Sequence, residues 1–316
     1  MNRIALVVLV ALSACKTTEA PKVADAAVVT KTKLVLNWVP EPEFGGWYAA
    51  RESGAFALHH LDVEIVGGGA GVPVMQLVAS GQADFGIAGA DEIVMARARG
   101  VDIVPLYATY QTSPQGIMVH EERGIEKLAD VFSSGTLAIE PGTPYAQWLK
   151  KKYGFGKVKV VPYDGGVARF LKDPTLAQQC YVTSEPLAVQ RAGAKTKVFL
   201  VADDGFNPYV GVVFTSAALV AKKPELVRAF LAATRSGWRG YLDHPEAGNA
   251  VMAKLNPSMS AETFAAAAQA QHDLVENAAT HAGGLGVMDR ARWDTLGKQL
   301  TELGVIDKAP VVPAFP

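Results

Sequence analysis

The sequence predicts an α/β protein of two lobes, each a mainly parallel sheet flanked by helices. Short apolar runs that suit buried strands alternate with amphipathic segments, first in one stretch of the chain and then in a second, before a purely helical tail. The chain has 316 residues, which is long for one domain and sufficient for two. Because strands that alternate with helices form parallel sheets covered on both faces, we expect two such sheets.

The amino terminus has the features of a secretory signal peptide, which we predict at residues 1–14. A basic start precedes an apolar run at residues 4–12, which is too short to span a membrane as a mature helix. Small residues stand directly before Cys15, as in a bacterial lipobox, where the cysteine takes a diacylglycerol and becomes the first residue. We therefore expect a lipidated Cys15 and a flexible tether over residues 15–32. The alternative is a plain signal peptide with an incidental cysteine.

The first stretch of alternating elements begins after this tether. Residues 33–36 suit a strand that ends before Pro40, and residues 43–53 suit a helix that Gly54 ends. The elements that follow alternate in the same way, with strands at 61–66, 85–88 and 101–107 and helices at 72–80 and 91–100.

The second stretch repeats the alternation, and the end of the chain is helical. We expect strands at 135–139, 157–161, 179–183 and 197–201, with helices near 145–153, 167–171 and 186–192. A last strand at 210–214 precedes helices at 224–242, 245–255, 260–276 and 289–303. We assign residues 33–115 and 212–316 to the first lobe and residues 116–211 to the second, with crossings near Gly116 and Gly211.

Composition and charge exclude several classes of function. The 30 Lys and Arg residues nearly balance the 31 Asp and Glu residues, which leaves no basic surface for nucleic acid. Only Cys180 remains after Cys15, so neither an internal disulfide nor a cysteine metal cluster can form. The six histidines do not form a metalloprotease motif, and we expect no metal, no cofactor and no catalytic residue.

Candidate ligand-binding residues lie in the loops at the strand ends of the first lobe, where open parallel sheets bind their ligands. Trp38 offers a flat face on which a heteroaromatic ring could stack, although ordinary packing would also explain it. Asn37 can both donate and accept hydrogen bonds. Gly45 and Gly46 would let a ligand approach the backbone at a helix start. Gly89 and Asp91, at the start of a later helix, are expected to contact the ligand as well.

The strand ends of the second lobe supply a matching set of candidates. Tyr181, Thr183 and Glu185 follow one another at the end of a predicted strand, and Thr143 lies in a neighbouring strand-end loop. A glutamate in the first turn of a helix would also complement the helix dipole, so both roles are open for Glu185. Tyr209, before the second crossing, is either a second stacking face or a residue of the core or hinge.

Several motifs resemble the thiamine-pyrimidine-precursor binding family. They are Leu-Asn-Trp-Val-Pro at 36–40, Gly-Gly-Trp-Tyr-Ala-Ala at 45–50, Gly-Ala-Phe at 54–56, Gly-Gln-Ala-Asp-Phe-Gly at 81–86 and Ala-Arg-Ala-Arg-Gly at 96–100. This family unites the periplasmic binding components of ABC importers with fungal enzymes that make a pyrimidine precursor of thiamine. The later motifs also occur in binding proteins for sulfonates, nitrate and riboflavin precursors. The resemblance implies a two-lobed architecture like that of type II periplasmic binding proteins.

The resemblance also bears on catalysis. The enzymes of the family use a histidine after the first tryptophan as a pyrimidine source, together with a cysteine-rich motif. Phe44 stands at the place of that histidine, and the matching second-lobe segment follows the single Cys180. The position of Phe44 touches the ligand ring in relatives, and an acidic residue that matches Glu185 contacts the ligand's amino group. These departures imply a pocket without the enzymatic chemistry.

We therefore expect an extracytoplasmic solute-binding component of an ABC importer, periplasmic or on the cell surface, monomeric and anchored to a membrane by its lipid. Its ligand is expected to be a small heteroaromatic molecule, similar to a pyrimidine or a riboflavin precursor. Its protein partner is expected to be an ABC transporter permease. The alternative is an exported enzyme similar to hydroxymethylpyrimidine phosphate synthase, or a sensor module that uses the same cleft.

Overall fold

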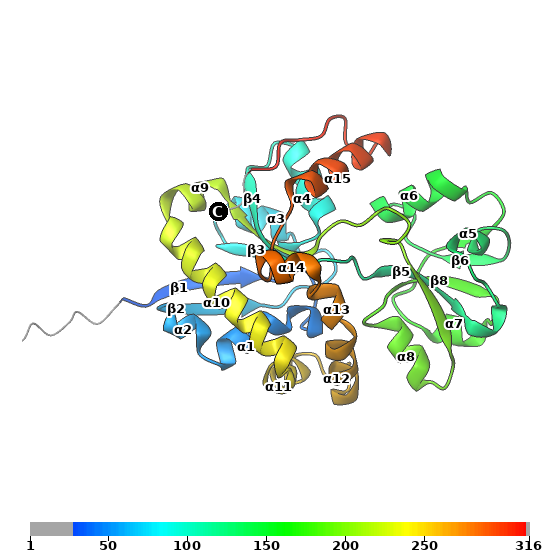
Figure 1. The fold of residues 1–316 in the computed structure, drawn as a ribbon, viewed down its shortest axis with the longest axis horizontal. Helices are drawn as coiled ribbons and strands as arrows, with labels where there is room; N and C mark the ends of the chain where they lie inside the picture. Colours follow the sequence, from blue (N-terminus) through cyan, green and yellow to red (C-terminus); the bar gives the residue numbers. More distant parts are fainter. Residues whose placement is uncertain (1–27, 314–316) are drawn as a thin grey trace, which may run out of the picture.

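The computed structural model describes residues 28–313, which form two lobes, each built on its own five-stranded sheet (Figure 1). The expected signal peptide and Cys15 lie outside the described residues. Strand β1 (Thr30–Val35) begins inside the segment expected as a tether, because it pairs in parallel along its whole length with β2 (Leu61–Val66). None of the helices in the described part of the chain is long and apolar enough to cross a membrane.

The first sheet has the strand order β2-β1-β3-β10-β4. Its further strands are β3 (Phe85–Ala88), β4 (Ile103–Tyr110) and β10 (Val210–Ser216). Strand β1 is parallel to β2 and β3, whereas β10 is antiparallel to both β3 and β4. The chain re-enters this lobe through β10, so the strand that returns from the second lobe is the one that runs against its neighbours.

The second sheet has the order β7-β6-β8-β5-β9 and follows the same plan. Strand β6 is parallel to β7 and β8, and β5 is antiparallel to β8 and β9. Here too the antiparallel strand, β5, is the one through which the chain enters the lobe. The bounds of these strands are β5 (Gln115–His120), β6 (Thr136–Ala138), β7 (Lys159–Val161), β8 (Leu176–Tyr181) and β9 (Thr196–Leu200).

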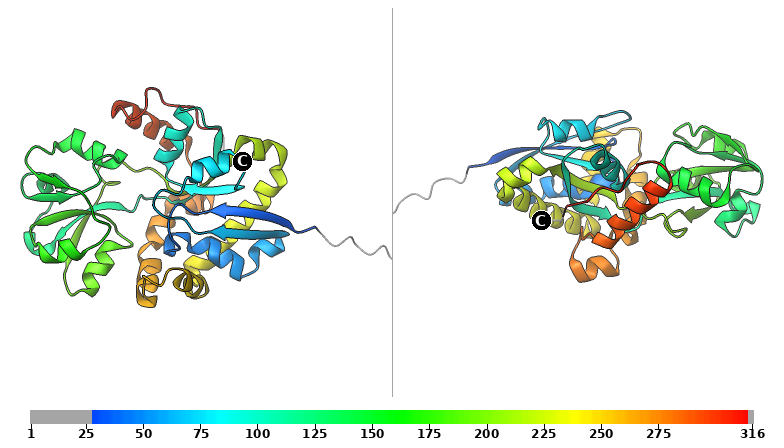
Figure 2. Two further views of the ribbon diagram at one scale, coloured as in Figure 1. Left: turned by 180° about the vertical axis from the view of Figure 1, so that it is seen from behind. Right: turned by 90° about the horizontal axis from the view of Figure 1, so that it is seen from above.

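Two short segments connect the lobes, residues 111–114 and residues 201–209, and both are visible in the two views of Figure 2. The two segments are hydrogen-bonded to each other and to one arginine. The Ser113 amide donates to the side chain of Asn207 at 2.9 Å. The Arg292 guanidinium donates to the carbonyl oxygens of Gln111 and Asn207 at 2.6 and 2.8 Å. The crossings therefore form one connected unit.

Helices cover both faces of the first sheet and form two separate apolar cores. One core joins α1, α2, α10, α11 and α12 to the sheet, and the other joins α3, α4 and α15 to the opposite face. Side chains alternate between the two faces of the sheet along each strand, which places them in alternate cores. Leu34 and Leu36 belong to the first core and Val35 to the second. The bounds of these helices are α1 (Gly45–Glu52), α2 (Ala55–Leu58), α3 (Val74–Ala79), α4 (Ala90–Ala98), α10 (Pro224–Asp243), α11 (Glu246–Leu255), α12 (Ala261–Ala270) and α15 (Arg290–Glu302).

Shorter helices complete both lobes. In the second lobe, Phe170 of α7 and Val189 of α8 are fully buried in a core with Leu176 of β8. The bounds of the remaining helices are η1 (Pro42–Phe44), η2 (Glu121–Arg123), α5 (Leu128–Val131), α6 (Pro144–Tyr153), α7 (Ala168–Lys172), α8 (Glu185–Arg191), α9 (Ala217–Lys222), α13 (His272–Val275) and α14 (Ala278–Gly283).

Glycines allow α1 and α10 to approach closely. A Cβ atom on Gly46 would lie 2.3 Å from the ring of Trp238, and one on Gly45 would lie 2.0 Å from the ring of Tyr241. From the other helix, a Cβ atom on Gly237 would lie 2.2 Å from the carbonyl oxygen of Gly46. The indoles of Trp47 and Trp238 meet edge to face at 5.4 Å in the same interface. The glycines are therefore part of the core packing that holds the first lobe together.

We predict that Gly237→Ala destabilises the protein, because the added methyl group meets backbone that cannot move aside. The free energy of unfolding should fall by about 1–3 kcal/mol in chemical denaturation. The matched control is Gly240→Ala on the same helix, where a Cβ atom has open space. This second change should raise stability by about 0.5–1 kcal/mol through helix propensity. Equal stabilities of the two variants would contradict the packing role.

Candidate ligand-binding cleft

A cavity of about 450 Å³ lies between the two lobes, within the size range of small-molecule sites. Asn37, Asp91 and Glu92 line it from the first lobe, and Glu140 and Tyr181 line it from the second. The crossings close its inner side. Its other lining residues are Gly89, Met95, Ser113, Gln115, Gly142, Thr143, Pro144, Tyr145, Gln179, Val201, Phe206, Pro208 and Val210.

A second cavity of about 730 Å³ adjoins the first and belongs to the first lobe alone. It lies between the loop after β2, helix α3 and helix α4. Trp38 lines it with an exposed fraction of 43%. The two cavities share Asn37, Glu92 and Met95 on their linings, so they meet at the end of β1 and on one side of α4.

Six of the residues expected to bind the ligand line one of these cavities. Asn37, Gly89, Asp91, Thr143 and Tyr181 face the inter-lobe cavity, and Asn37 and Trp38 face the second one. Whether these side chains touch a ligand stays a prediction.

Phe44, Gly45 and Gly46 do not line either cavity. Phe44 is 1% exposed and packs against Trp47, with ring centroids 6.2 Å apart. The two glycines face Tyr241 and Trp238, and the Gly45 amide donates to the carbonyl of Pro42. The aromatic side chains of α10 occupy the space beside both glycines, and a ligand contact at this backbone stays a prediction.

Tyr209 has a role in the core and at the crossing. Its hydroxyl accepts a hydrogen bond from the Asp289 amide at 2.8 Å, and the Arg292 guanidinium lies 3.8 Å from its ring centroid. Its ring is 3% exposed and tilts against Trp293. Of the two roles that the sequence left open, the structure shows the one in the core.

Thr183 and Glu185 lie at the edge of the second lobe, outside the cavity linings. Thr183 is 8% exposed and lies beside Tyr110 of the other lobe, where its hydroxyl lowers the Tyr110 pKa against the larger effect of burial. Glu185 accepts hydrogen bonds from the Tyr181 amide at 2.7 Å and the Tyr163 hydroxyl at 2.5 Å. The structure therefore shows Glu185 bonded within its own lobe at the start of α8, and its ligand contact stays a prediction.

Two carboxyl groups that sequence reasoning did not single out, Glu41 and Glu43, lie in the loop after β1. Burial, together with the charges of Glu41 and Glu185, raises the pKa of Glu43 to about 8. Burial and the charge of Glu185 raise the pKa of Glu41 to about 7, against a smaller opposing effect of the Trp38 side chain. Glu185 belongs to the other lobe, so charges of the two lobes act on one another here, although none of these three residues lines either cavity. A sequence signal existed in Glu-Pro-Glu at 41–43, between the first strand and the helix that follows it.

The start of α4 adds further negative charge to the cleft. The Glu92 side chain accepts a hydrogen bond from the Gly89 amide at 2.7 Å. Burial raises the pKa of Asp91 to about 6, and the Glu92 charge adds to this, while hydrogen bonds from the Asp91 and Glu92 amides lower it. The amides that could have bound an anion at this helix start are therefore already bonded to carboxylates of the chain.

Buried hydrogen bonds fix the loop after β1 to the helical tail and to the crossing. The Gln271 side chain accepts from the Tyr110 hydroxyl at 2.6 Å and donates to the Pro42 carbonyl at 3.0 Å. The Leu274 carbonyl accepts from the amides of Gln111 and Thr112. The single helix expected at 260–276 is accordingly divided at Gln271 into α12 and α13.

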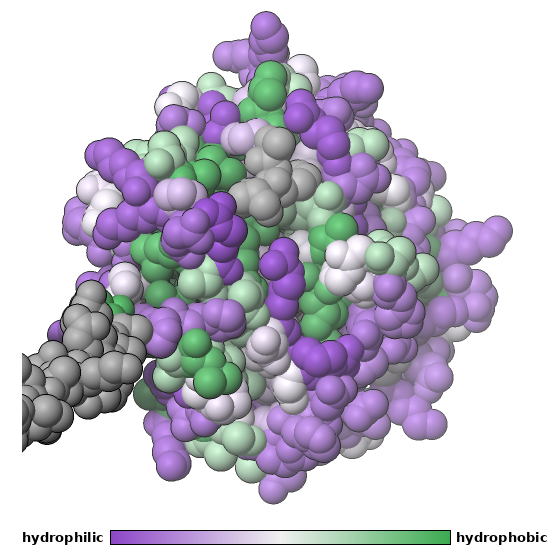
Figure 3. Space-filling view, turned by 60° about the vertical axis from the view of Figure 1, so that its left-hand side comes forward, coloured by the Kyte–Doolittle hydropathy of each residue, from purple (hydrophilic) through white to green (hydrophobic). Residues whose placement is uncertain are grey.

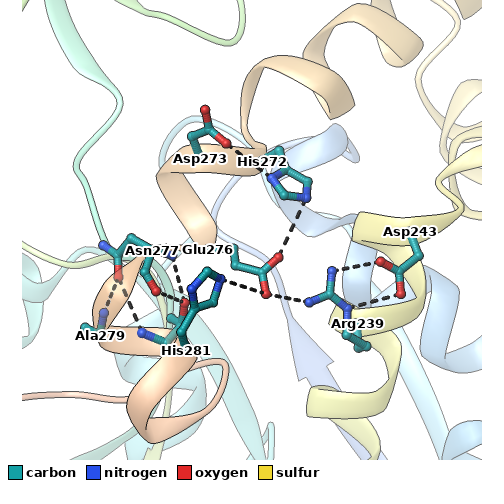
Figure 4. Close-up of polar contacts among 9 residues, drawn as sticks. Arg239, Asp243, His272, Asp273, Glu276, Asn277, Ala279 and His281 are labelled. Atoms are coloured by element: carbon teal, nitrogen blue, oxygen red, sulfur yellow. Dashed lines mark hydrogen bonds and ion pairs between the residues drawn. The ribbon is translucent and has the colours of Figure 1, made fainter.

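An ion-pair cluster follows α13 on the outside of the lobe (Figure 4). The Glu276 carboxylate accepts a hydrogen bond from Arg239 at 2.6 Å, and this bond lowers the Glu276 pKa. The ring nitrogens of His272 and His281 lie 3.7 and 3.6 Å from the same carboxylate. Within residues 28–313 no group of three potential metal ligands has a geometry that could hold a metal ion. The cluster therefore anchors α13 and α14 to α10.

The fold is that of the periplasmic binding proteins. The periplasmic aliphatic sulphonate binding protein SsuA from Escherichia coli superimposes with a TM-score of 0.65 at 15% identity, covering 90% of this chain and 94% of that one.

The chain belongs to the NMT1/THI5 like family, whose model matches residues 41–248. It is 23% identical to the riboflavin-binding protein RibY of Chloroflexus aurantiacus, over 93% of this chain and 86% of the relative. It is also 23% identical to a formylaminopyrimidine-binding protein of Halalkalibacterium halodurans, over 76% of this chain and 74% of that relative. A 4-amino-5-hydroxymethyl-2-methylpyrimidine phosphate synthase of Legionella pneumophila is 20% identical over 90% of both chains. The resemblance inferred from the sequence motifs is thereby confirmed.

We predict that Glu43 makes the stability of the ligand-free protein fall as the pH rises from about 4.5 to about 8. In this range the folded state holds a proton on Glu43 that the unfolded state has released, so folding becomes less favourable with each pH unit. Glu43→Gln removes this titration. The variant should match the wild type near pH 4.5 and exceed it by on the order of 1–3 kcal/mol at pH 8.

Urea denaturation at several pH values measures this difference. The matched control is Glu122→Gln, at an exposed position in the second lobe, which should leave the pH profile unchanged. A Glu43→Gln profile parallel to that of the wild type would show that Glu43 is not held in an unfavourable environment.

Proposed function

We propose that this protein is the solute-binding component of an ABC importer and that it captures a small heteroaromatic amine between its two lobes. The proposal is supported by the periplasmic-binding-protein fold, by membership of the NMT1/THI5 like family and by relatives named for binding riboflavin and formylaminopyrimidine. The observation that carries it is the acidic lining of the inter-lobe cavity.

Charge determines which kind of solute suits the cleft. Asp91, Glu92 and Glu140 line the inter-lobe cavity, and among its described lining residues there is no Lys, Arg or His. An anionic solute would lose its hydration here without gaining a cationic partner. An amino group on a ring can instead donate hydrogen bonds to these carboxylates, and such charge-assisted bonds are among the stronger ones. The cleft therefore suits a donor-rich or cationic ring better than a sulfonate.

We propose binding without turnover. Phe44, at the place of the histidine that the enzymes of the family use, is buried in the core. Cys180 is 1% exposed, and burial raises its thiol pKa well above the ordinary value. A thiol in that environment stays protonated and is a poor nucleophile.

The two lobes would close over the solute. Asn37 lies on one wall of the inter-lobe cavity and Tyr181 on the other, and within residues 28–313 the backbone passes between the lobes at residues 111–114 and 201–209. A solute that contacts both walls binds the closed form more tightly and shifts the population toward it. The boundaries proposed for the lobes are residues 33–115 with 212–316, and residues 116–211.

We expect 2,4-diaminopyrimidine to bind and benzenesulfonate not to bind in titration calorimetry at pH 7. Asp91→Asn should weaken the binding of the diamine about 5- to 20-fold, since it removes a charged acceptor and keeps the helix cap. Glu122→Gln, outside the cleft, serves as the control and should leave the affinity unchanged.

Two further measurements test binding and closure. Mass spectrometry should recover the diamine unchanged, and small-angle scattering should show a smaller radius of gyration at saturation. Tighter binding of the sulfonate would overturn the charge argument, and conversion of the diamine would favour an enzyme.

We further propose an extracytoplasmic, lipid-anchored monomer that delivers its solute to an ABC transporter permease. The signal peptide and Cys15 support the anchor. On the face of the molecule shown in Figure 3, apolar residues lie in small groups between hydrophilic ones, a pattern that suits a protein acting as a monomer.

The expected mature protein begins at a diacylglyceryl-modified Cys15. Intact-mass analysis should show the lipid, and the protein should partition with membranes. Cys15→Ala should yield soluble or unprocessed protein. A wild-type protein with a free cysteine and cleavage at another residue would contradict the anchor.

A further inference from the structure

The second cavity is a groove between two helical stripes. Glu92, Met95, Ala96 and Arg99 of α4 and its C-terminal end line one wall, with the spacing of one face of a helix. The other wall is formed by α3 and the residues just before it. Its lining residues have the spacing of one helix face as well, at positions 72, 75, 76 and 79. Residues Ile87 and Ala88 of β3 form part of the floor, so the groove reaches down to the sheet.

The walls of this groove are mainly apolar and partly open to solvent, and Gln76, Glu92 and Arg99 are their polar side chains. Trp38 is 43% exposed and Val72 is 37% exposed, which is unusual for such side chains beside a cavity. Met75 and Met95 add flexible thioether side chains, which adapt to ligands of different shape. Covering this surface with an apolar group removes apolar area from water and therefore stabilises a complex.

The groove has a fixed shape where it meets the inter-lobe cavity. The Gly68 amide donates to the Trp38 carbonyl at 2.9 Å, and a Cβ atom on Gly68 would lie 2.1 Å from the Leu36 carbonyl oxygen. The loop after β2 is thus packed directly on the segment that carries Asn37 and Trp38. A preformed wall of this kind lowers the cost of binding.

The two compartments adjoin and differ in chemistry. The inter-lobe cavity has carboxylates on both walls, whereas most of the groove lining is apolar, with Asn37, Gln76, Glu92 and Arg99 as its polar side chains apart from the Trp38 indole. Asn37, Glu92 and Met95 belong to both linings, so a molecule that occupied both compartments would pass beside these three residues.

We propose that the groove between α3 and α4 is a second subsite for the same solute, which binds an apolar ring or chain attached to the polar ring in the inter-lobe cavity. This inference rests on the proposed function and refines it. The solute is then an amphiphilic molecule of two or more rings, or one ring with an apolar chain, rather than a single pyrimidine ring.

Methionine-methyl NMR tests the groove without reference to the natural solute. The Met75 methyl group reports on the groove alone, and the Met95 methyl group reports on the boundary that both cavities share. Toluene should shift the Met75 signal, 2,4-diaminopyrimidine should shift Met95 only, and 2,4-diamino-5-benzylpyrimidine should shift both. The Met118 methyl group, buried in the second lobe, is the internal reference.

Affinities provide the second readout. The benzyl compound should bind at least 10-fold more tightly than 2,4-diaminopyrimidine, because the ring heads are identical and only the apolar group differs. Ala96→Phe fills the groove and should abolish this gain while changing the affinity for the unsubstituted diamine less than 2-fold. The matched control is Ala98→Phe, at an exposed position of the same helix outside the groove lining, which should retain the gain.

The outcomes separate this inference from the proposed function. If toluene leaves Met75 unmoved, or if the benzyl compound gains nothing over the diamine, the groove is not a ligand subsite and the proposed function stands. If neither diamine binds but toluene shifts Met75, the groove holds apolar groups and the proposed head group is wrong. A gain that persists in Ala96→Phe would place the benzyl ring elsewhere and overturn the proposal.

Discussion

The fully buried amide of Gln271 connects the three segments that shape the cleft. It bonds to Tyr110 at the end of β4 and to the carbonyl of Pro42 in the loop after β1, and it lies where α12 meets α13. A buried amide without partners would cost free energy, so these segments keep their relative positions only together. The Leu274 carbonyl extends the connection to the crossing through Gln111 and Thr112. The position of Glu41 and Glu43 thus depends on helices more than 200 residues away in the sequence.

This arrangement keeps carboxyl groups in a place where their charge is unfavourable. Desolvation, with the charge of Glu185, raises the pKa of Glu41 to about 7, and desolvation with the charges of Glu41 and Glu185 raises the pKa of Glu43 to about 8. A protein that needed only stability would replace such groups by apolar ones. Groups with strongly raised pKa values are typical of functional sites.

The two compartments beside Asn37 divide recognition into a polar and an apolar part. In the proposed function, the carboxylates of the inter-lobe cavity disfavour anionic solutes. Methionine and tryptophan side chains in the groove select by size and hydrophobicity instead. In this proposal, specificity arises because one solute has to fit both the inter-lobe cavity and the groove.

Local sequence determined the class of fold and part of the site. Alternating apolar runs and amphipathic segments predicted two α/β lobes followed by a helical tail, because periodicity follows from which side chains a strand or a helix buries. Strand ends next to polar residues predicted that Asn37 and Asp91 would lie at the edge of one lobe and Tyr181 at the facing edge of the other, and all three line the inter-lobe cavity.

Tertiary structure alone decided the roles of Phe44, Gly45, Gly46 and Tyr209. A glycine before or within a helix looks the same in sequence whether a ligand or a tryptophan approaches it, and here Trp238 and Tyr241 arrive from almost 200 residues further along. The raised pKa values of Glu41 and Glu43 were equally hidden, because burial and the charge of Glu185 come from the folded chain and not from neighbours in sequence. Periodicity reports which side of an element is buried, whereas the partner that buries it is set only when distant segments pack together.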